Sequence, residues 1–300
     1  MKNTSSRFIA IIQAVFVVFL WATSWVLVKI GLQDIPPVTF AGLRYFLTFL
    51  CLLVVMNLNS AKRDVRQLPK AAWLRLVILG ILFYAITQGA IFVALAHLPA
   101  VPVNLLWSFS SVTVAVLGAA WLSERPSAVQ WMGMALAILG ALIYFFPVSI
   151  PHNQTIGVIV ALLGILANAV SSILGRDINR SGKYPPLAVT VVSMGAGSIL
   201  LLAAGIATEG IPAINLRSWG IILWLALVNT AFAFTLWNHT LRTLSAVESS
   251  IINGTMMIWI PILAILFLGE TITGKEIIGL IITGLGTLIV QLRISPANKG

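Results

Sequence analysis

Amide, hydroxyl and aromatic side chains recur at helical spacing inside long apolar stretches of this 300-residue chain. Trp21, Ser24 and Trp25 fall at positions i, i+3 and i+4 of the first stretch, so a helix would carry them on one face. Unsatisfied polar groups cost free energy at membrane depth, so we expect these side chains to face protein or an internal cavity. Aromatic walls with a few hydrogen-bonding groups suit a small organic molecule.

Similar side chains in other apolar stretches complete the predicted lining of one cavity. Asn168 and Ser171 match Trp21 and Ser24 after a shift of 147 residues, so the same face is polar or aromatic in two places. For the serines, close packing between helices is the alternative role. The candidate lining residues are Trp21, Ser24, Trp25, Tyr84, Gln88, Asn104, Trp107, Ser108, Ser111, Asn168, Ser171, Asn229, Trp237 and Asn253.

Five ionisable side chains in or beside the apolar stretches are candidates for gating or ion coupling. Arg44 lies about two turns inside the second stretch, where it either attracts a carboxylate or extends to the interface. His239 and Glu248 could relay protons, with helix capping and anchoring as the alternative. Lys29 and Arg176 are equivalent after the shift of 147 residues and are expected to serve as gate or anchor charges at opposite faces.

The composition predicts an all-α integral membrane protein. Apolar residues make up 59% of the chain and charged residues 9%, whereas a soluble domain carries about 25% charged residues. The apolar runs are about 20 residues long, which is enough for a helix to cross the hydrocarbon core. We predict ten membrane helices, near residues 8–31, 37–58, 72–95, 99–121, 127–147, 155–176, 185–207, 217–241, 245–268 and 273–293.

The distribution of basic residues predicts the orientation of these helices. With ten spans, 14 of the 18 Lys and Arg residues fall on the side of the N-terminus and 4 on the other side. Basic residues concentrate in cytoplasmic segments, so both termini are expected in the cytoplasm. The net charge of +10 is therefore read as a topology signal, and membrane lipids rather than nucleic acid are the expected surroundings.

An internal duplication organises the chain. Residues 98–143 align without a gap on residues 244–289, and the identical positions include Glu124 with Glu270, Gly133 with Gly279, and Gly140 with Gly286. Each copy holds five spans, an odd number, so the second copy must be inverted in the membrane. Secondary transporters commonly use such inverted repeats. The expected divisions are residues 1–147, a linker at 148–154, residues 155–293 and a cytoplasmic tail at 294–300.

Several motifs resemble the EamA branch of the drug/metabolite transporter superfamily. The segment from Phe19 to Trp25, followed by Lys29, resembles that family's first helix, and Pro36-Pro37 through Tyr45 resembles the start of its second helix. Leu268-Gly269-Glu270 resembles the Gly-Glu signature after its ninth helix, and Leu122-Ser123-Glu124 is the first-half version.

The resemblance implies ten helices in two inverted halves with a substrate cavity between them. It also implies export of amino acids or related small metabolites across a bacterial inner membrane. Efflux of other small organic solutes or drugs is one alternative. A receptor or scaffold that transports nothing is the alternative from another class.

No enzymatic or cofactor motif accompanies these features. His97, His152 and His239 are widely separated, no Walker sequence occurs, and a single cysteine excludes a Cys-rich metal site. We therefore expect no enzyme activity, no cofactor and no metal, and a small-molecule substrate as the main partner. The sequence leaves open which substrate is moved and whether the chain forms a homo-oligomer.

Overall fold

A computed structural model describes residues 4–58, 65, 68–121, 126–147, 151–180 and 184–291. The first half contains α1 (Thr4–Gly31), α2 (Pro37–Leu58), α4 (Lys70–Gly80), η1 (Ile81–Thr87), α5 (Gln88–His97), α6 (Ala100–Ser108), α7 (Ser110–Trp121) and α8 (Ala128–Phe145). The second half contains α9 (His152–Arg180), α10 (Pro186–Glu209), α11 (Leu216–Ala226), η2 (Leu227–Phe232), α12 (Ala233–Thr240), α13 (Ala246–Gly254), α14 (Met256–Leu268) and α15 (Gly274–Gln291).

These elements form ten helices that are long and apolar enough to cross a membrane. The prediction of an all-helical protein with ten spans is confirmed. The sixth helix, α9, begins at His152, directly after Pro151 and inside the predicted linker. Glu124, residues 148–150 of that linker and the predicted tail at 294–300 lie outside the described residues.

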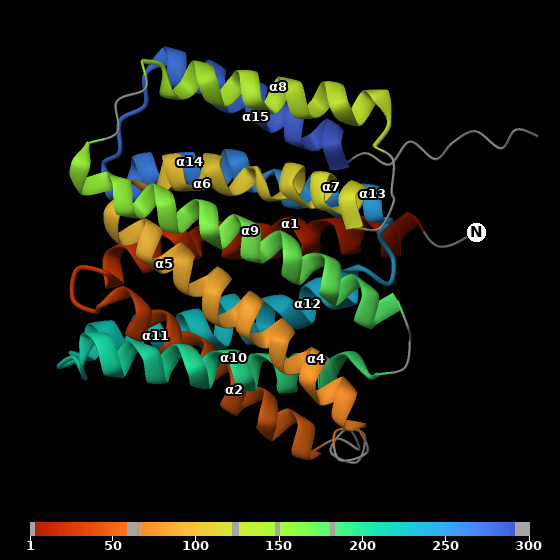
Figure 1. Cartoon of the computed structure of the whole chain (residues 1–300), viewed down its shortest axis with the longest axis vertical. Coiled ribbons are helices and arrows are strands. Elements are labelled where there is room, and N and C mark those ends of the chain that lie inside the picture. Colours follow the sequence, from red (N-terminus) through yellow and green to blue (C-terminus); the bar gives the residue numbers. More distant parts are fainter. Residues whose placement is uncertain are drawn as a thin grey trace, which may run out of the picture.

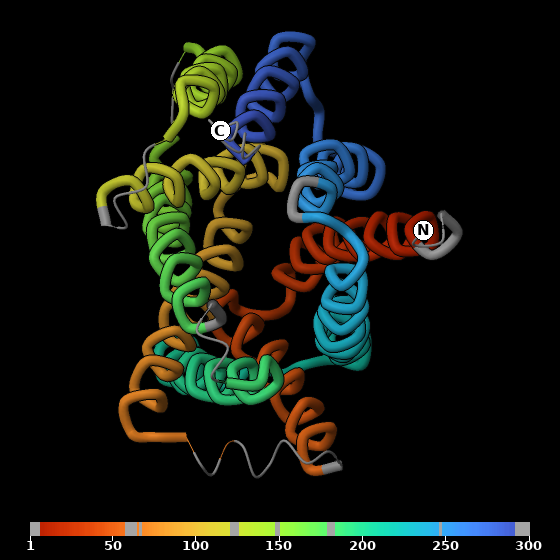
Figure 2. Tube along the Cα trace, turned by 90° about the vertical axis from the view of Figure 1, so that its right-hand side faces the viewer, coloured from red at the N-terminus to blue at the C-terminus, as the bar shows by residue number. Residues whose placement is uncertain are grey.

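The helices run side by side between two faces of the molecule (Figure 1). We call the face where α1 begins and α15 ends the N face, and the opposite face, where α1 ends, the distal face. Helices α8 and α15 pack together at one edge, and α2 packs against α10 at the other. Viewed from the N face, the helices surround a central axis, and α1 stands between these two edges (Figure 2).

The duplication is visible in the positions where the helices deviate from regular α geometry. The π-helices η1 and η2 begin 146 residues apart, each in the middle of a membrane span. The next span of each half is interrupted by one tight turn, at Phe109 and at Thr255, again 146 residues apart. π and 3₁₀ segments inside helices often mark functional hinges. Four such segments therefore occur at equivalent positions of the two halves.

The glycines conserved between the two copies lie where α8 packs against α15. A Cβ atom on Gly140 would lie 2.4 Å from the amide nitrogen of Thr283, and one on Gly279 would lie 2.7 Å from the carbonyl oxygen of Gly140. Small residues let helix backbones approach closely in a membrane. The duplicated glycines are therefore explained by this pairing of the fifth and tenth spans.

Substitution of Gly286 by alanine is expected to destabilise the protein. The new Cβ atom would lie 2.3 Å from the amide nitrogen of Ala137, and overpacking of this kind costs about 1–3 kcal/mol. The matched control is Gly220→Ala in α11, where nothing lies within 4 Å of the new atom. Thermal unfolding of the purified proteins in detergent should separate them, and equal midpoints would contradict this account of the α8–α15 contact.

Candidate functional site

Four polar side chains from α1, α2 and η2 meet inside the membrane region, and we call them the central cluster: Ser24, Arg44, Asn229 and Thr230. Arg44 is only 6% exposed. Its Nε donates a hydrogen bond to the Thr230 hydroxyl at 3.1 Å, and its Nη2 lies 3.5 Å from the Ser24 hydroxyl. The guanidinium thus points into the protein, which favours the inward alternative predicted for Arg44 over extension to the interface.

Asn229 attaches the second half of the chain to α1. Its side-chain amide donates to the carbonyl oxygen of Leu20, to the Thr23 hydroxyl at 3.1 Å and to the Ser24 hydroxyl at 2.9 Å. Its other polar atom, Oδ1, is buried and has no partner among the described residues. A buried acceptor without a partner calls for an explanation, such as a water molecule or a ligand.

The π-helix η2 supports the position of these groups. The wider turn leaves the Leu225 carbonyl oxygen to accept a hydrogen bond from the Thr230 hydroxyl, five residues later, at 2.8 Å. In η1 the Thr87 hydroxyl donates to the Leu82 carbonyl oxygen at 2.8 Å over the same separation. Both spans therefore stabilise their irregular segment with a threonine hydroxyl.

Tyr45 connects Arg44 to two of the predicted lining residues on the third span. The Tyr45 hydroxyl donates to Gln88 Oε1 at 2.7 Å, and its ring centroid lies 5.8 Å from that of Tyr84. The Arg44 Cζ lies 5.2 Å from the Tyr45 ring centroid. Gln88 and Tyr84 thus lie around Tyr45, the neighbour of Arg44 on α2.

A crevice of about 300 Å³ extends from the N face toward the central cluster. At the N face its lining includes His239 and Arg242, and deeper it includes Tyr84 and Thr230. Thr48, also in the lining, donates to the Arg44 carbonyl oxygen at 2.9 Å. The crevice therefore reaches the immediate neighbours of Arg44.

The predicted tryptophans occupy two environments. Trp21 and Trp237 come together, with ring centroids 5.2 Å apart, and Phe234 packs on Trp21 at 5.2 Å. Trp21 Nε1 is buried without a partner among the described residues. Trp25 is 8% exposed in the main apolar core. Trp25 thus lies in the packed interior, away from the aromatic group that Trp21 forms.

A second polar group lies between α7 and α9. Asn168 Oδ1 accepts a hydrogen bond from Ser110 at 2.8 Å. Three predicted serines instead donate to carbonyl oxygens of their own spans, which fits the packing alternative: Ser108 to Leu105, Ser111 to Ser108, and Ser171 to Asn168. The structure therefore divides the predicted lining between the central cluster and this separate group.

The remaining lining candidates lie on the fourth and ninth spans. Trp107 packs over Gly164 of α9, where a Cβ atom would lie 2.9 Å from the indole ring. Asn104 is 5% exposed, and its Nδ2 has no partner among the described residues. Asn253 is exposed on α13. These residues are candidates for contact with a ligand that has entered between the halves.

At the distal face, two carboxylates of the second half cap helix starts of the first half. Gly269 ends α14 in the left-handed conformation (φ 67°), where a residue without Cβ is favoured. The next residue, Glu270, accepts hydrogen bonds from the amide nitrogens of Ala100 at 2.6 Å and Val101 at 3.0 Å, the first residues of α6. A carboxylate is favourable at a helix N-terminus because of the helix dipole and the unpaired N–H groups.

Lys29 and Glu209 complete what we call the distal closure, formed by Lys29, Glu209 and Glu270. The Lys29 ammonium donates to the carbonyl oxygens of Leu95 at 2.6 Å and Leu98 at 2.7 Å, and Lys29 and Glu270 line the same distal cavity of about 710 Å³. Glu209 accepts from the amide nitrogens of Val38 at 3.0 Å and Thr39 at 2.8 Å at the start of α2.

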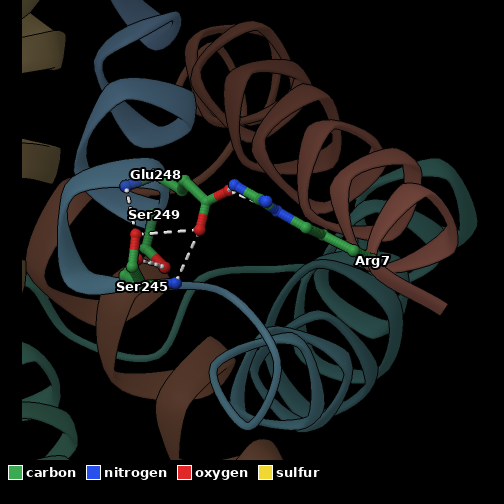
Figure 3. A network of polar contacts seen from close by, with 4 residues as sticks. All are labelled: Arg7, Ser245, Glu248 and Ser249. Carbon is green, nitrogen blue, oxygen red and sulfur yellow. Dashed lines mark hydrogen bonds and ion pairs between the residues drawn. The ribbon is translucent and has the colours of Figure 1, made fainter. Parts of the chain in front are cut away.

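At the N face Glu248 serves as a helix cap (Figure 3). It accepts from the Ser245 amide nitrogen at 2.8 Å, while the Ser245 hydroxyl accepts from the Glu248 amide, and together they form a capping box at the start of α13. Its carboxylate also accepts from Arg7 Nε at 2.9 Å. The capping alternative predicted for Glu248 is therefore the contact that the structure contains.

The other two candidates for gating or coupling lie near the same face. His239 is exposed on α12 and lines the N-face crevice. Arg176 is partly buried in the last turns of α9, beside Asp177, which forms an ion pair with Arg75 of the first half. Lys29 and Arg176 thus lie toward opposite faces, as their equivalence in the duplication predicts.

Several residues with direct contacts to the site were absent from the sequence-based set. Tyr45 and Thr48 contact Arg44, and Glu209 and Glu270 join the halves at the distal face. The sequence could have identified Tyr45 as a site residue, because it follows Arg44 in the second-helix motif. The same holds for Glu270, because the duplication repeats it as Glu124.

Comparison with known proteins is consistent with this architecture. Residues 8–146 and 155–292 each match the EamA-like transporter family. The chain is 24% identical over 274 residues to "Uncharacterized transporter YoaV" of Bacillus subtilis, covering 88% of this chain and 90% of the relative. It is 26% identical over 298 residues to "Probable amino-acid metabolite efflux pump" of Salmonella typhimurium, covering 94% and 95%. A solved structure titled "Crystal structure of protein" superposes with a TM-score of 0.66 at 16% identity, covering 94% of this chain and 96% of that chain.

Proposed function

Because this chain belongs to the EamA-like transporter family, a family of multi-pass membrane transporters and not of enzymes, we propose that it exports amino acids or related small metabolites by alternating access. A protein that is similar over almost its whole length is named a probable amino-acid metabolite efflux pump, which supports this substrate class. The two proposed halves, residues 1–147 and 155–293, then move relative to each other around the candidate lining residues.

The observation that carries this proposal is the difference between the two faces. At the distal face Glu209 and Glu270 of the second half bind helix starts of the first half, and Lys29 binds carbonyl oxygens within the first half. From the N face a crevice reaches Thr230 and Tyr84. A carrier open to one side and closed to the other has this arrangement, and inverted halves can exchange the two roles.

The N face is assigned to the cytoplasm in this proposal, because it holds the start of α1 and the sequence predicts 14 of the 18 basic residues on the side of the N-terminus. Both termini are then cytoplasmic, and the membrane is the bacterial inner membrane. The crevice opens toward the metabolite pool of the cell, which is the side from which an exporter takes its substrate.

Trans-stimulated efflux tests the proposal. Proteoliposomes containing the purified protein are loaded in turn with each labelled protein amino acid, and efflux is measured with and without the unlabelled compound outside. A carrier whose loaded form reorients faster than its empty form gives saturable efflux that external substrate accelerates. Efflux that fails to saturate over a wide concentration range would indicate a channel and would refute alternating access.

Glu248→Gln is expected to retain most of the transport activity. In the structure this carboxylate caps α13 and contacts Arg7 at the N face, and glutamine keeps an acceptor for the Ser245 amide nitrogen. The check compares efflux of Glu248→Gln and wild type with and without an imposed pH gradient. Loss of a pH-gradient response in the variant alone would instead assign proton coupling to Glu248.

A further inference from the structure

Arg44 is a cation buried inside the membrane region, and none of the described carboxylates bonds to it. Its guanidinium donates only to the hydroxyls of Thr230 and Ser24 among the described residues. The two described ion pairs, Arg7–Glu248 and Arg75–Asp177, both lie at the N face. By sequence, all eight acidic residues of the chain fall at the ends of the ten spans or between them.

Such a charge is costly unless a partner of opposite charge is supplied. A buried charge without compensation strongly destabilises a protein, and ionisable groups inside membrane helices are mostly functional. The described residues around Arg44 supply two neutral hydroxyls and the ring of Tyr45, none of which carries a negative charge, so a ligand can supply it. From this we infer that Arg44 binds the carboxylate of the transported metabolite, a step that rests on the proposed transport function.

The crevice gives a ligand access to this position. Thr230, which accepts the hydrogen bond from Arg44 Nε, and Thr48, one turn beyond Arg44 on α2, both line it. A ligand carboxylate that reaches Thr230 can replace the hydroxyl as the acceptor for the guanidinium. The volume of about 300 Å³ corresponds to a small metabolite, and Tyr84 and Phe234 in the lining offer aromatic contact to its side chain.

Asn229 supplies the complementary acceptor. Its amide nitrogen faces the Leu20 carbonyl oxygen, which can only accept, so the orientation of the carboxamide is fixed and Oδ1 is the unpaired atom. Asn229 and Arg44 both contact the Ser24 hydroxyl. A buried cationic donor and an unpaired acceptor thus lie around one hydroxyl, which matches the carboxylate and ammonium of an amino acid.

One guanidinium also selects among anions. Arginine presents two parallel N–H groups that match one carboxylate. A doubly charged phosphate would require further basic groups beside Arg44, and the basic side chains that line the crevice, His239 and Arg242, lie at its N-face end. The chemistry therefore favours a ligand with a single negative charge.

The test compares each amino acid with its own carboxamide, which has the same shape and lacks the negative charge. Thermal stabilisation of the purified protein measures binding, and efflux from proteoliposomes measures transport. We expect the wild type to prefer the acid over the carboxamide by roughly tenfold to a hundredfold, since hydrogen bonds to charged groups have this strength. Arg44→Gln should abolish the preference, and Arg44→Lys, which keeps the charge, should retain part of it.

Arg75→Gln is the matched control, because it removes an arginine whose partner Asp177 lies outside the site, and its preference should equal that of the wild type. Equal response of the wild type to acid and carboxamide, which requires no variant to fold, would overturn the inference. So would a full preference retained in Arg44→Gln. Acid-selective binding without efflux would refute the transport function and support the carboxylate site at Arg44. Efflux that does not distinguish the acid from the carboxamide would support the transport function and refute the carboxylate site.

Discussion

Glu270→Gln is expected to open the distal face and to lower the rate of transport. The carboxylate of Glu270 accepts hydrogen bonds from the Ala100 and Val101 amide nitrogens across the boundary between the halves. Hydrogen bonds to a charged group are worth about 1.5–3 kcal/mol, and the lower value applies because Glu270 is only partly buried. Glutamine keeps one acceptor but removes the charge, so the distal-closed form should lose roughly tenfold in population.

Cysteine labelling measures this shift in a background in which Cys51, the only cysteine, is replaced by serine. An impermeant maleimide added from the distal side should label Asn104→Cys, which is 5% exposed in the closed form, faster in Glu270→Gln. The same reagent, added in a separate experiment from the N face, should label Asn238→Cys in the N-face crevice more slowly in Glu270→Gln than in the parent protein. The control is Glu276→Gln, since Glu276 caps its own helix through Thr273. Unchanged rates at both positions would show that the closure does not depend on Glu270.

Asn229→Leu is expected to abolish most transport while the protein remains in the membrane. The substitution preserves the approximate size of the side chain but removes the three donated hydrogen bonds that join η2 to α1. The Leu20 carbonyl oxygen keeps the Thr23 hydroxyl as a donor at 2.7 Å, so the expected cost is that of the lost hydrogen bonds, about 0.5–1.5 kcal/mol each. The same change also removes the unpaired Oδ1, the acceptor that we assign to the ligand.

Efflux per mole of reconstituted protein and the thermal midpoint are measured together for Asn229→Leu. The control is Asn153→Leu, at an exposed position in the first turn of α9, which should transport like the wild type. If Asn229→Leu loses stability but keeps normal efflux, Asn229 is a packing residue and not part of the transport site.

The overall fold could be predicted because the thickness of the membrane dictates the length of the apolar runs. The apolar run from Phe8 to Ile30 is long enough to predict a membrane helix, and the spacing of Glu124 and Glu270 indicated the duplication. The irregular segments could not be predicted in the same way. In the π-helix η2 the Thr230 hydroxyl bonds to the carbonyl oxygen of Leu225, five residues earlier. This change of partner leaves no trace in the apolar composition of the span.

The candidate site was predictable residue by residue but not as a set of contacts. Arg44, Ser24 and Asn229 each stood out as polar groups in apolar runs, yet hydropathy does not specify which distant helix supplies a partner. Arg44 and Thr230 are 186 residues apart, and Glu270 caps a helix that begins 170 residues earlier. Such pairings depend on how the spans are arranged around the central axis, and a single sequence does not encode that arrangement in a periodic pattern.

The two equivalent helices α6 and α13 begin differently, and this affects the energetics of the empty carrier. The N-cap of α13 is Ser245, which with Glu248 satisfies its own first turn, whereas the N-cap of α6 is Pro99, which offers no side-chain acceptor. Closing the distal face therefore satisfies N–H groups of α6 that would otherwise lack a partner, while α13 needs nothing from the opposite half.

In the proposed alternating-access cycle, this asymmetry favours the conformer open at the N face when no substrate is bound, so that a solute arriving from the distal side meets a minority conformer. Its half-saturating concentration is then higher on that side by the ratio of the two populations, although the equilibrium distribution of the solute is unaffected.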